Sequence, residues 1–393
     1  MLFTSVSAYA ADYERPREPI YDPSGRALES FHASLRRTAR GVASTRVMQF
    51  GASHTEADQF TGYLREVFQA QFGDAGHGYI MPALPWRGYS HMDVRVNSSK
   101  GWITGKAYSK TGQTDGLYGL GGFSCSTKSS LDWAWVATSQ RSNFGRAVSR
   151  IEVSWLAQPE GGSFDLLVDR KLTATIRTNH SVVQPDYKQI LVPDGPHEVE
   201  IRPKGDGEVR LLGMLLERNA AGVVVDSLGI RGARASVMLK WDADVWMSQL
   251  RRRQPHLVIL AYGTNESGDT HQSIGRYERT LSKVIARVKG ATPQASCVLV
   301  GPTDRPLRLD RKWTRRHRVT EVIGAQRRVA SRFGCGFWDA RDSMGGEMSI
   351  LRWREADPPM AAKDMVHLTT GGYYALADDL YNALLYGWRY QRP

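Results

Sequence analysis

A serine stands just beyond the first apolar segment that could form a buried strand. The segment Thr45–Phe50 is short and is followed by Gly51, and Ser53 comes where a helix-like pattern begins. In open α/β sheets, ligands bind beyond the carboxyl ends of the strands. A serine there is exposed and its own N–H lies near the positive end of the helix, so Ser53 could attack a carbonyl and help to hold the oxyanion. Taken alone, the segment is also typical of a serine that only caps a helix.

An aspartate and a histidine near the end of the sequence are spaced to work as a pair. Asp364 and His367 are separated by one turn, so both side chains can face the same side. The carboxylate can then hold the imidazole in the tautomer whose other nitrogen takes the serine proton. An isolated pair of this spacing also arises as a cap or a surface contact. In company with Ser53, it predicts a triad with His367 as general base.

Two further loops carry donors that suit an oxyanion. Gly232 follows the apolar stretch Gly222–Asp226, and Asn265 follows an apolar stretch that ends at Tyr262. A backbone N–H and a side-chain amide can each donate to a tetrahedral intermediate, and each contributes about 2–4 kcal/mol of transition-state stabilisation. We expect Gly232 and Asn265, with the N–H of Ser53, to form the oxyanion hole.

Other polar residues suggest weaker alternatives. His77 and His91 have no metal-ligand spacing, and His256 at a strand start is better explained as structural. Glu266 and Asp269 could pass for the carboxylate pair of a glycosidase, but both lie on one short loop. Four tryptophans could stack on sugars or pack in a core: Trp86, Trp102, Trp133 and Trp135. The chemistry of the serine needs no cofactor and no metal, and we predict none.

These residues need a scaffold of alternating strands and helices. Apolar residues recur at helical spacing over 55–72, directly after the first strand. Downstream the pattern predicts strands at 257–262, 296–300 and 336–339, and helices at 277–288, 319–333 and 370–386. Such alternation favours an α/β fold in which helices cover both faces of a parallel sheet.

Between these parts the composition and the hydrophobic pattern of the sequence change. Residues 93–222 are punctuated by Gly, Ser and Thr and contain short alternating segments without a long helical pattern. The segments that read as strands are 151–156, 163–169, 188–192, 197–201 and 209–216. An inserted all-β sandwich explains both features. We therefore expect a first part of the α/β domain at 11–92, the insertion at 93–222 and a second part at 223–393.

In chain order, the four pieces resemble the blocks of the SGNH (GDSL-like) hydrolases. The matching residues are Gly51-Ala-Ser53, Gly232, Gly263-Thr-Asn265 and Asp364-Met-Val-His367, within segments 45–90 and 223–390. The resemblance implies a serine hydrolase with Ser53 as nucleophile, Asp364 and His367 as its partners, and Gly232 and Asn265 as oxyanion donors.

Several further features are similar to the peptidoglycan O-acetylesterases of Gram-negative bacteria, the Ape family. They are His54, the stretches 72–79, 223–230 and 344–346, and the β insertion, which in that family is similar to a carbohydrate-binding module. One position departs from the family: Ala52 stands where Asp is usual, as in Gly-Asp-Ser. That Asp is generally not the triad acid, so its loss removes hydrogen bonds that shape the turn and leaves Asp364 and His367 in place.

Composition and charge limit the partners and the compartment. The 393-residue chain has a net charge of +12 and no apolar run long enough for a membrane span, and its basic stretches lack a nucleic-acid-binding motif. The opening residues 1–10 end in the small-x-small pattern of a signal-peptide cleavage site, although an ordinary N-terminus also fits. Cys125, Cys297 and Cys335 form no CxxC, and we expect the last two to be buried thiols.

Together these observations predict an esterase that is periplasmic or otherwise exported to the bacterial cell envelope. It is expected to remove O-acetyl groups from an envelope glycan, with peptidoglycan as the expected substrate. We expect no nucleic acid and no membrane insertion, and the sequence identifies no protein partner. Two alternatives remain open. The same acyl-enzyme could pass its acyl group to a sugar hydroxyl, which would make the protein an O-acyltransferase. Ala52 could instead mark a weakened site in a protein that only binds glycans.

Overall fold

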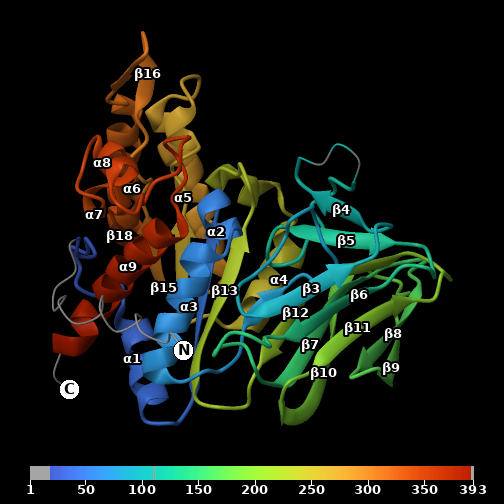
Figure 1. Cartoon of the computed structure of the whole chain (residues 1–393). Helices are drawn as coiled ribbons and strands as arrows, with labels where there is room; N and C mark the ends of the chain where they lie inside the picture. The colour runs from blue at the N-terminus through green and yellow to red at the C-terminus, as the bar shows by residue number, and fades with distance from the viewer. Residues whose placement is uncertain (1–17, 109, 111, 391–393) are drawn as a thin grey trace.

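The computed structural model describes residues 18–108, 110 and 112–390, which form a parallel β-sheet with flanking helices beside two antiparallel sheets (Figure 1). The expected leader at residues 1–10 lies outside the described residues. Within the described ranges, none of the helices has the length and apolar character needed to cross a membrane.

A five-stranded parallel sheet lies at the centre of the α/β part. Its strands, in spatial order, are β13 (Gly222–Gly229), β1 (Ser44–Gly51), β14 (Leu257–Ala261), β15 (Ser296–Val300) and β18 (Gly336–Trp338). Alternate residues of β1 pack into different cores: Val47 into one, Met48 and Phe50 into the other. Because both faces are covered, these strands are largely buried and mostly apolar, with polar exceptions such as Gln49 of β1 and Asp226 of β13.

Helices cover the two faces of this sheet. One face packs against α1 (Glu29–Ala39), α3 (Gln59–Phe72) and α9 (Thr370–Tyr390), and the other against α4 (Ala243–Arg253), α5 (Ile274–Ala291) and α6 (His317–Phe333). Shorter helices are α2 (Ser53–Glu56), α7 (Ala340–Ser343) and α8 (Ser349–Glu355), with 3-10 turns η1 (Ala235–Lys240) and η2 (Glu266–Gly268). The predicted α/β fold is confirmed.

The helix expected over 55–72 is two helices in the structure. Helix α2 ends at Glu56, and α3 begins at Gln59 after Asp58, whose backbone is left-handed at φ 52°. The buried carboxylate of Asp58 accepts hydrogen bonds from Arg65 and from the N–H of Met92. These contacts hold a conformation that non-glycine residues rarely adopt.

The predicted antiparallel β sheets form beside the α/β part (Figure 1). One sheet contains β10 (Gln184–Gly195), β7 (Val148–Ala157), β12 (Val209–Glu217), β5 (Phe123–Thr127) and β4 (Ile103–Lys106), and β2 (Gly78–Ile80) also pairs with β12. The other contains β3 (Val94–Ser98), β6 (Ala134–Thr138), β11 (Glu198–Pro203), β8 (Ser163–Val168) and β9 (Lys171–Arg177). A small hairpin, β16 (Leu307–Leu309) and β17 (Lys312–Thr314), stands apart.

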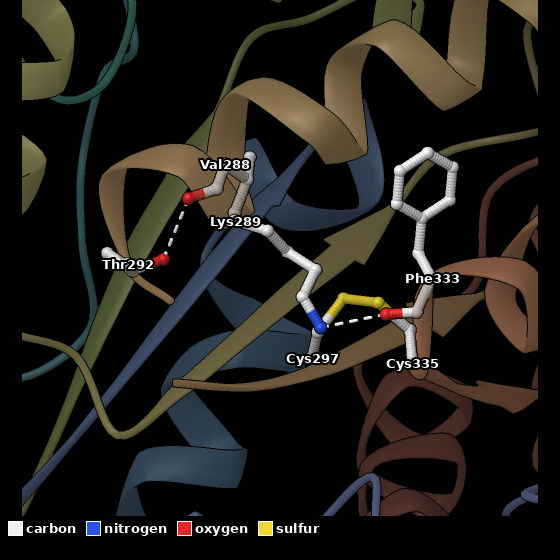
Figure 2. The surroundings of a disulfide bond; sticks show 6 residues. All are labelled: Val288, Lys289, Thr292, Cys297, Phe333 and Cys335. Carbon is white, nitrogen blue, oxygen red and sulfur yellow. Dashed lines mark hydrogen bonds between the residues drawn. A yellow bond between two sulfur atoms is a disulfide. The ribbon is translucent and has the colours of Figure 1, made fainter. Parts of the chain in front are cut away.

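The prediction that Cys297 and Cys335 are thiols is wrong, because the two residues form a disulfide (Figure 2). Cys297 lies in β15 and Cys335 just before β18, its neighbour in the sheet, where Val298 pairs with Gly336. The register therefore brings the two cysteines side by side. The sequence alone did not predict this disulfide, because it does not show which strand lies next to β15.

Candidate active site

Three loops meet where three neighbouring strands end. Gly51 at the end of β1 is in register with Gly229 of β13 on one side and with Ala261 of β14 on the other. Ser53, Gly232 and Asn265 follow these three strand ends within a few residues. The parallel sheet therefore brings the predicted nucleophile and both predicted oxyanion loops to one edge.

Helix α2, which begins with the serine, is seated on the sheet through Thr55. The Gln49 side-chain amide donates to Thr55 Oγ1 over 3.1 Å, and Ser227 Oγ donates to the Thr55 carbonyl over 3.0 Å. A Cβ at Gly51 would lie 2.1 Å from Thr55 Oγ1, and one at Gly229 would lie 2.1 Å from the nitrogen of Glu56. Two glycines are thus needed for the close approach of α2 to the strands.

Ala52, in place of the usual Asp, does not leave the turn without hydrogen bonds. Its carbonyl accepts from the N–H groups of Thr55 at 3.1 Å and Glu56 at 2.9 Å. Its methyl group is buried. The backbone bonds of Ala52, with the contacts of Thr55, define the turn that carries Ser53.

The serine, histidine and aspartate form a continuous hydrogen-bonded chain. His367 Nε2 lies 2.9 Å from Ser53 Oγ, and His367 Nδ1 lies 2.6 Å from Asp364 Oδ2. The other oxygen of Asp364 accepts from the backbone N–H groups of Val366 and His367, at 3.0 and 2.9 Å. This arrangement fixes Nδ1 of His367 as the donor to the carboxylate and leaves Nε2 to accept the serine proton.

Electrostatics keep Asp364 ionised. Partial burial acts to raise the pKa of this carboxyl, but hydrogen bonds from the His367 side chain and from the backbone of His367 and Val366 lower its pKa below the ordinary value. A carboxylate in this state can stabilise an imidazolium at His367.

The loops of Gly232 and Asn265 are joined to each other. Asn265 Nδ2 donates to the carbonyl of Ala233 over 2.8 Å. Buried Glu266 accepts from the N–H of Ala235 at 2.8 Å and from that of Gly263 at 3.0 Å, so its carboxylate spans both loops. An Asn amide carries two donor hydrogens, so the bond to Ala233 leaves a second hydrogen for a ligand.

Gly232 is exposed and has a left-handed backbone, at φ 74°. A Cβ there would meet nothing within 4 Å, so backbone conformation rather than crowding favours glycine.

The glycosidase alternative has no support here, because the carboxylate of Glu266 accepts hydrogen bonds from backbone N–H groups and Asp269 pairs with Arg234 at 2.6 Å.

Sequence reasoning missed the surroundings of Glu56. This buried residue accepts from Trp86 Nε1 at 2.7 Å and pairs with Arg231 at 3.3 Å, next to Gly232. No motif marks it, because its partners come from distant segments.

His77 and His91 contact each other at 3.1 Å, and in the ranges that the structure describes no group of His, Cys, Asp and Glu could hold a metal.

Comparison with known proteins supports the assignment of the fold. The sequence model of the GDSL-like lipase/acylhydrolase family matches residues 199–375. The chain carries a GDSL-like acylhydrolase domain. The matched segment contains Gly232, Asn265, Asp364 and His367 but not Ser53, which the β insertion separates from the others in sequence.

One solved structure matches almost the whole chain. It is described as a peptidoglycan O-acetylesterase and is 28% identical, with a TM-score of 0.79 over 95% of this chain and 99% of that chain. An acetylxylan esterase from Geobacillus stearothermophilus is 18% identical over 44% of this chain and 77% of its own, with a TM-score of 0.34. No curated protein matches the chain significantly in sequence. The predicted resemblance to SGNH hydrolases of the peptidoglycan O-acetylesterase type is confirmed.

Proposed function

We propose that the protein is a serine esterase that removes O-acetyl groups from peptidoglycan. The observation that carries this proposal is the hydrogen-bonded chain from Asp364 through His367 to Ser53. It occurs in a chain whose fold matches a peptidoglycan O-acetylesterase along nearly its full length. No metal or organic cofactor enters the proposed reaction.

In the first half of the reaction, Ser53 Oγ attacks the acetyl carbonyl carbon and its proton passes to His367 Nε2. The carbonyl oxygen becomes an oxyanion, which the N–H groups of Ser53 and Gly232 and the amide of Asn265 would stabilise. The carbon–oxygen bond to the sugar then breaks, and the imidazolium gives its proton to the leaving sugar oxygen. The products of this half are acetyl-Ser53 and a free sugar hydroxyl.

In the second half, His367 takes a proton from water, and the hydroxide attacks the acetyl carbon. The bond to Ser53 Oγ breaks, acetate leaves, and the imidazolium returns a proton to the serine. Asp364 does not change its protonation state. It holds the imidazole and stabilises its charged form in both halves.

Charge and the disulfide support an envelope location, which remains a proposal. Disulfides persist in oxidising compartments such as the periplasm, and Cys297–Cys335 is buried in the core. The net charge of +12 favours attraction to an anionic polymer such as peptidoglycan with its peptide carboxylates.

Acetate release from O-acetylated peptidoglycan tests the proposal directly. The intact protein is expected to release acetate, and Ser53→Ala and His367→Ala are each expected to lose most of this activity. Asp364→Asn should also lose activity, by up to about 10⁴-fold, because the amide no longer favours the required tautomer. Each variant is first compared with the wild type by circular dichroism.

Two results would contradict the proposal. Release by Ser53→Ala at the wild-type rate would remove Ser53 from the mechanism. Hydrolysis of a small acetate ester without release from the polymer would reject peptidoglycan as the substrate. Transfer of the acetyl group to an added glycan, detected by mass spectrometry, would instead identify the transferase alternative.

A further inference from the structure

A second imidazole lies beside the triad and has no part in the mechanism above. The rings of His54 and His367 have centroids 5.4 Å apart, with planes inclined at 47°. His54 Nδ1 lies 2.9 Å from the hydroxyl of Tyr373. His54 Nε2 is buried and has no hydrogen-bond partner among the described residues. A buried polar atom without a partner costs about 1–3 kcal/mol, so its presence needs an explanation.

Tyr373 is the hydrogen-bond partner of His54. Burial raises the pKa of Tyr373 to about 12, so its phenol keeps a proton at neutral pH. A protonated hydroxyl can donate to His54 Nδ1 or accept from Nδ1–H, according to the imidazole tautomer. In either tautomer one hydrogen bond links the two side chains.

His54 also stays uncharged throughout the range in which a serine esterase works. Burial, followed by the neighbouring His367 and Arg305, lowers the pKa of His54 to about 3, against an opposing effect of Asp364. An uncharged neighbour matters here because a second cation would oppose the imidazolium that forms on His367.

The pair joins the two segments that the reaction must keep aligned. His54 belongs to α2, directly after the nucleophile, and Tyr373 lies in the first turn of α9. The N–H of Tyr373 donates to the carbonyl of Thr369, two residues after His367, over 2.9 Å. The contacts from His54 through Tyr373 to Thr369 therefore form a second connection between the segments that carry Ser53 and His367.

We propose that His54, held by Tyr373, is a positioning residue that packs against His367 and keeps its Nε2 in line with Ser53. The inference rests on the proposed function, because it assigns His367 as the general base. A displacement of about 1 Å in such an arrangement can reduce turnover by about 100-fold. The pair is thus a second support for the imidazole, in addition to Asp364.

Four variants test the inference: His54→Leu, His54→Asn, Tyr373→Phe and the double variant His54→Leu/Tyr373→Phe. The first readout is the rate at which a fluorophosphonate modifies Ser53, which reports activation of the serine without the natural substrate. The second is kcat and KM for a small acetate ester. Tyr374→Phe is the matched control, because its ring stacks on Tyr63 instead of reaching the triad.

His54→Leu is expected to lower both the modification rate and kcat by about 10- to 100-fold, with KM nearly unchanged. His54→Asn should recover most of the loss, because its amide can accept or donate the hydrogen bond that His54 shares with Tyr373. The double variant should be hardly worse than either single variant, because both substitutions break one linkage.

Three results would overturn the inference: full modification rate in His54→Leu, additive losses in the double variant, or no recovery in His54→Asn. If His54→Leu fails to fold, Tyr373→Phe and His54→Asn still decide, since a wild-type rate in Tyr373→Phe excludes the role. A wild-type protein that the reagent does not modify would overturn the proposed function together with this inference. Modification without acetate release from peptidoglycan would reject only the substrate.

Discussion

The side-chain amide of Asn265 has both a structural and a predicted catalytic role, and an alanine substitution tests the two roles. Its amide ties the Asn265 loop to Ala233 and is also the predicted side-chain donor to the oxyanion. The second bond strengthens only as negative charge develops on the substrate oxygen. We therefore expect Asn265→Ala to lower kcat by about 100- to 1000-fold with a smaller effect on KM. Steady-state kinetics with a small acetate ester give both values.

The exposed Asn219, remote in sequence from the triad, provides the control for this variant. Asn219→Ala should behave as the wild type in both kinetics and thermal unfolding. A change in KM alone for Asn265→Ala would assign the residue to substrate positioning. Equal falls in kcat and in melting temperature would instead assign it to the support of the Gly232 loop.

At the scale of secondary-structure elements, the position of α2 against the sheet requires glycines in the strands that it approaches, because a side chain there would collide with the helix. A Cβ at Gly229 would lie 2.1 Å from the nitrogen of Glu56 and 2.5 Å from its Cα. These are backbone atoms, so they can move only together with the rest of α2. Gly229→Ala should therefore shift α2 and Ser53 and lower kcat by about 100-fold, by the displacement argument used for the triad. The measurement is ester hydrolysis together with the rate of serine modification.

Gly195→Ala is the matched control, because a Cβ at Gly195 of β10 would meet nothing within 4 Å. It should leave kcat unchanged. Wild-type kcat in Gly229→Ala would show that α2 tolerates displacement and that its close approach to β13 is not needed for activity.

The disulfide joins two strands at the ends remote from the triad. Cys297 is near the beginning of β15, whereas Ser53 lies beyond the carboxyl end of the sheet. Because the bridge closes a segment of 38 residues, Cys297→Ala/Cys335→Ala should lower the free energy of unfolding by about 2–4 kcal/mol. Small-ester turnover of the folded variant should stay at the wild-type value. Denaturant unfolding measures the first effect, and unchanged stability would contradict it.

Local patterns in the sequence predict the elements better than the contacts between them. The strand expected at 296–300 coincides with β15, and the helix expected at 319–333 begins two residues earlier, at His317. Both follow from apolar periodicity, which neighbouring residues determine. The break at Asp58 and the disulfide could not be predicted, because Arg65, Met92 and the strand order fix them through the folded chain.

The candidate site divides in the same way. The serine, the DxxH pair and the two oxyanion loops could be found because each has a recognisable spacing or place after a strand. Glu56 and the partnership of His54 with Tyr373 could not, since they arise where α2, α9 and a loop meet. The reacting residues could be recognised from spacing along the sequence, whereas the residues that hold them in place could be recognised only from contacts in the folded structure.

At the scale of the whole molecule, the β sheets and the α/β part share one core. Phe50 of β1 packs against Trp246 of α4, and the indole N–H of Trp246 donates to the carbonyl of Leu120. Buried Arg253 of α4 pairs with Glu217 of β12 as well as with Asp226 of β13. Removing residues 93–222 would leave Arg253 without one of its partners and expose apolar surface, so point variants are the better test of what the β sheets do.

The outer face of the sheet that contains β6 offers such a test. Trp133 and Trp135 are partly exposed there, and Trp135 lies between Asn97 of β3 and Glu200 of β11 in register. A hollow of about 610 Å³ lies over this face, lined by Ser130, Leu131, Asp132, Trp133, Trp135, Arg170, Glu198, Glu200 and Arg202. Aromatic faces beside polar groups suit a sugar ring, which has both apolar C–H faces and hydroxyls.

If this face holds a glycan strand, Trp133→Ala/Trp135→Ala should impair the polymer reaction without touching the triad. An aromatic contact contributes about 0.5–1.5 kcal/mol beyond its buried area, so losing two predicts a fall of roughly tenfold in acetate release from O-acetylated peptidoglycan. Turnover of a small acetate ester should be unchanged. Leu172→Ala, which removes an exposed apolar side chain from β9 of the same sheet, should affect neither reaction. Equal losses on polymer and small ester in a folded double variant would assign the tryptophans a structural role, because only a substrate contact made by the polymer alone can separate the two rates.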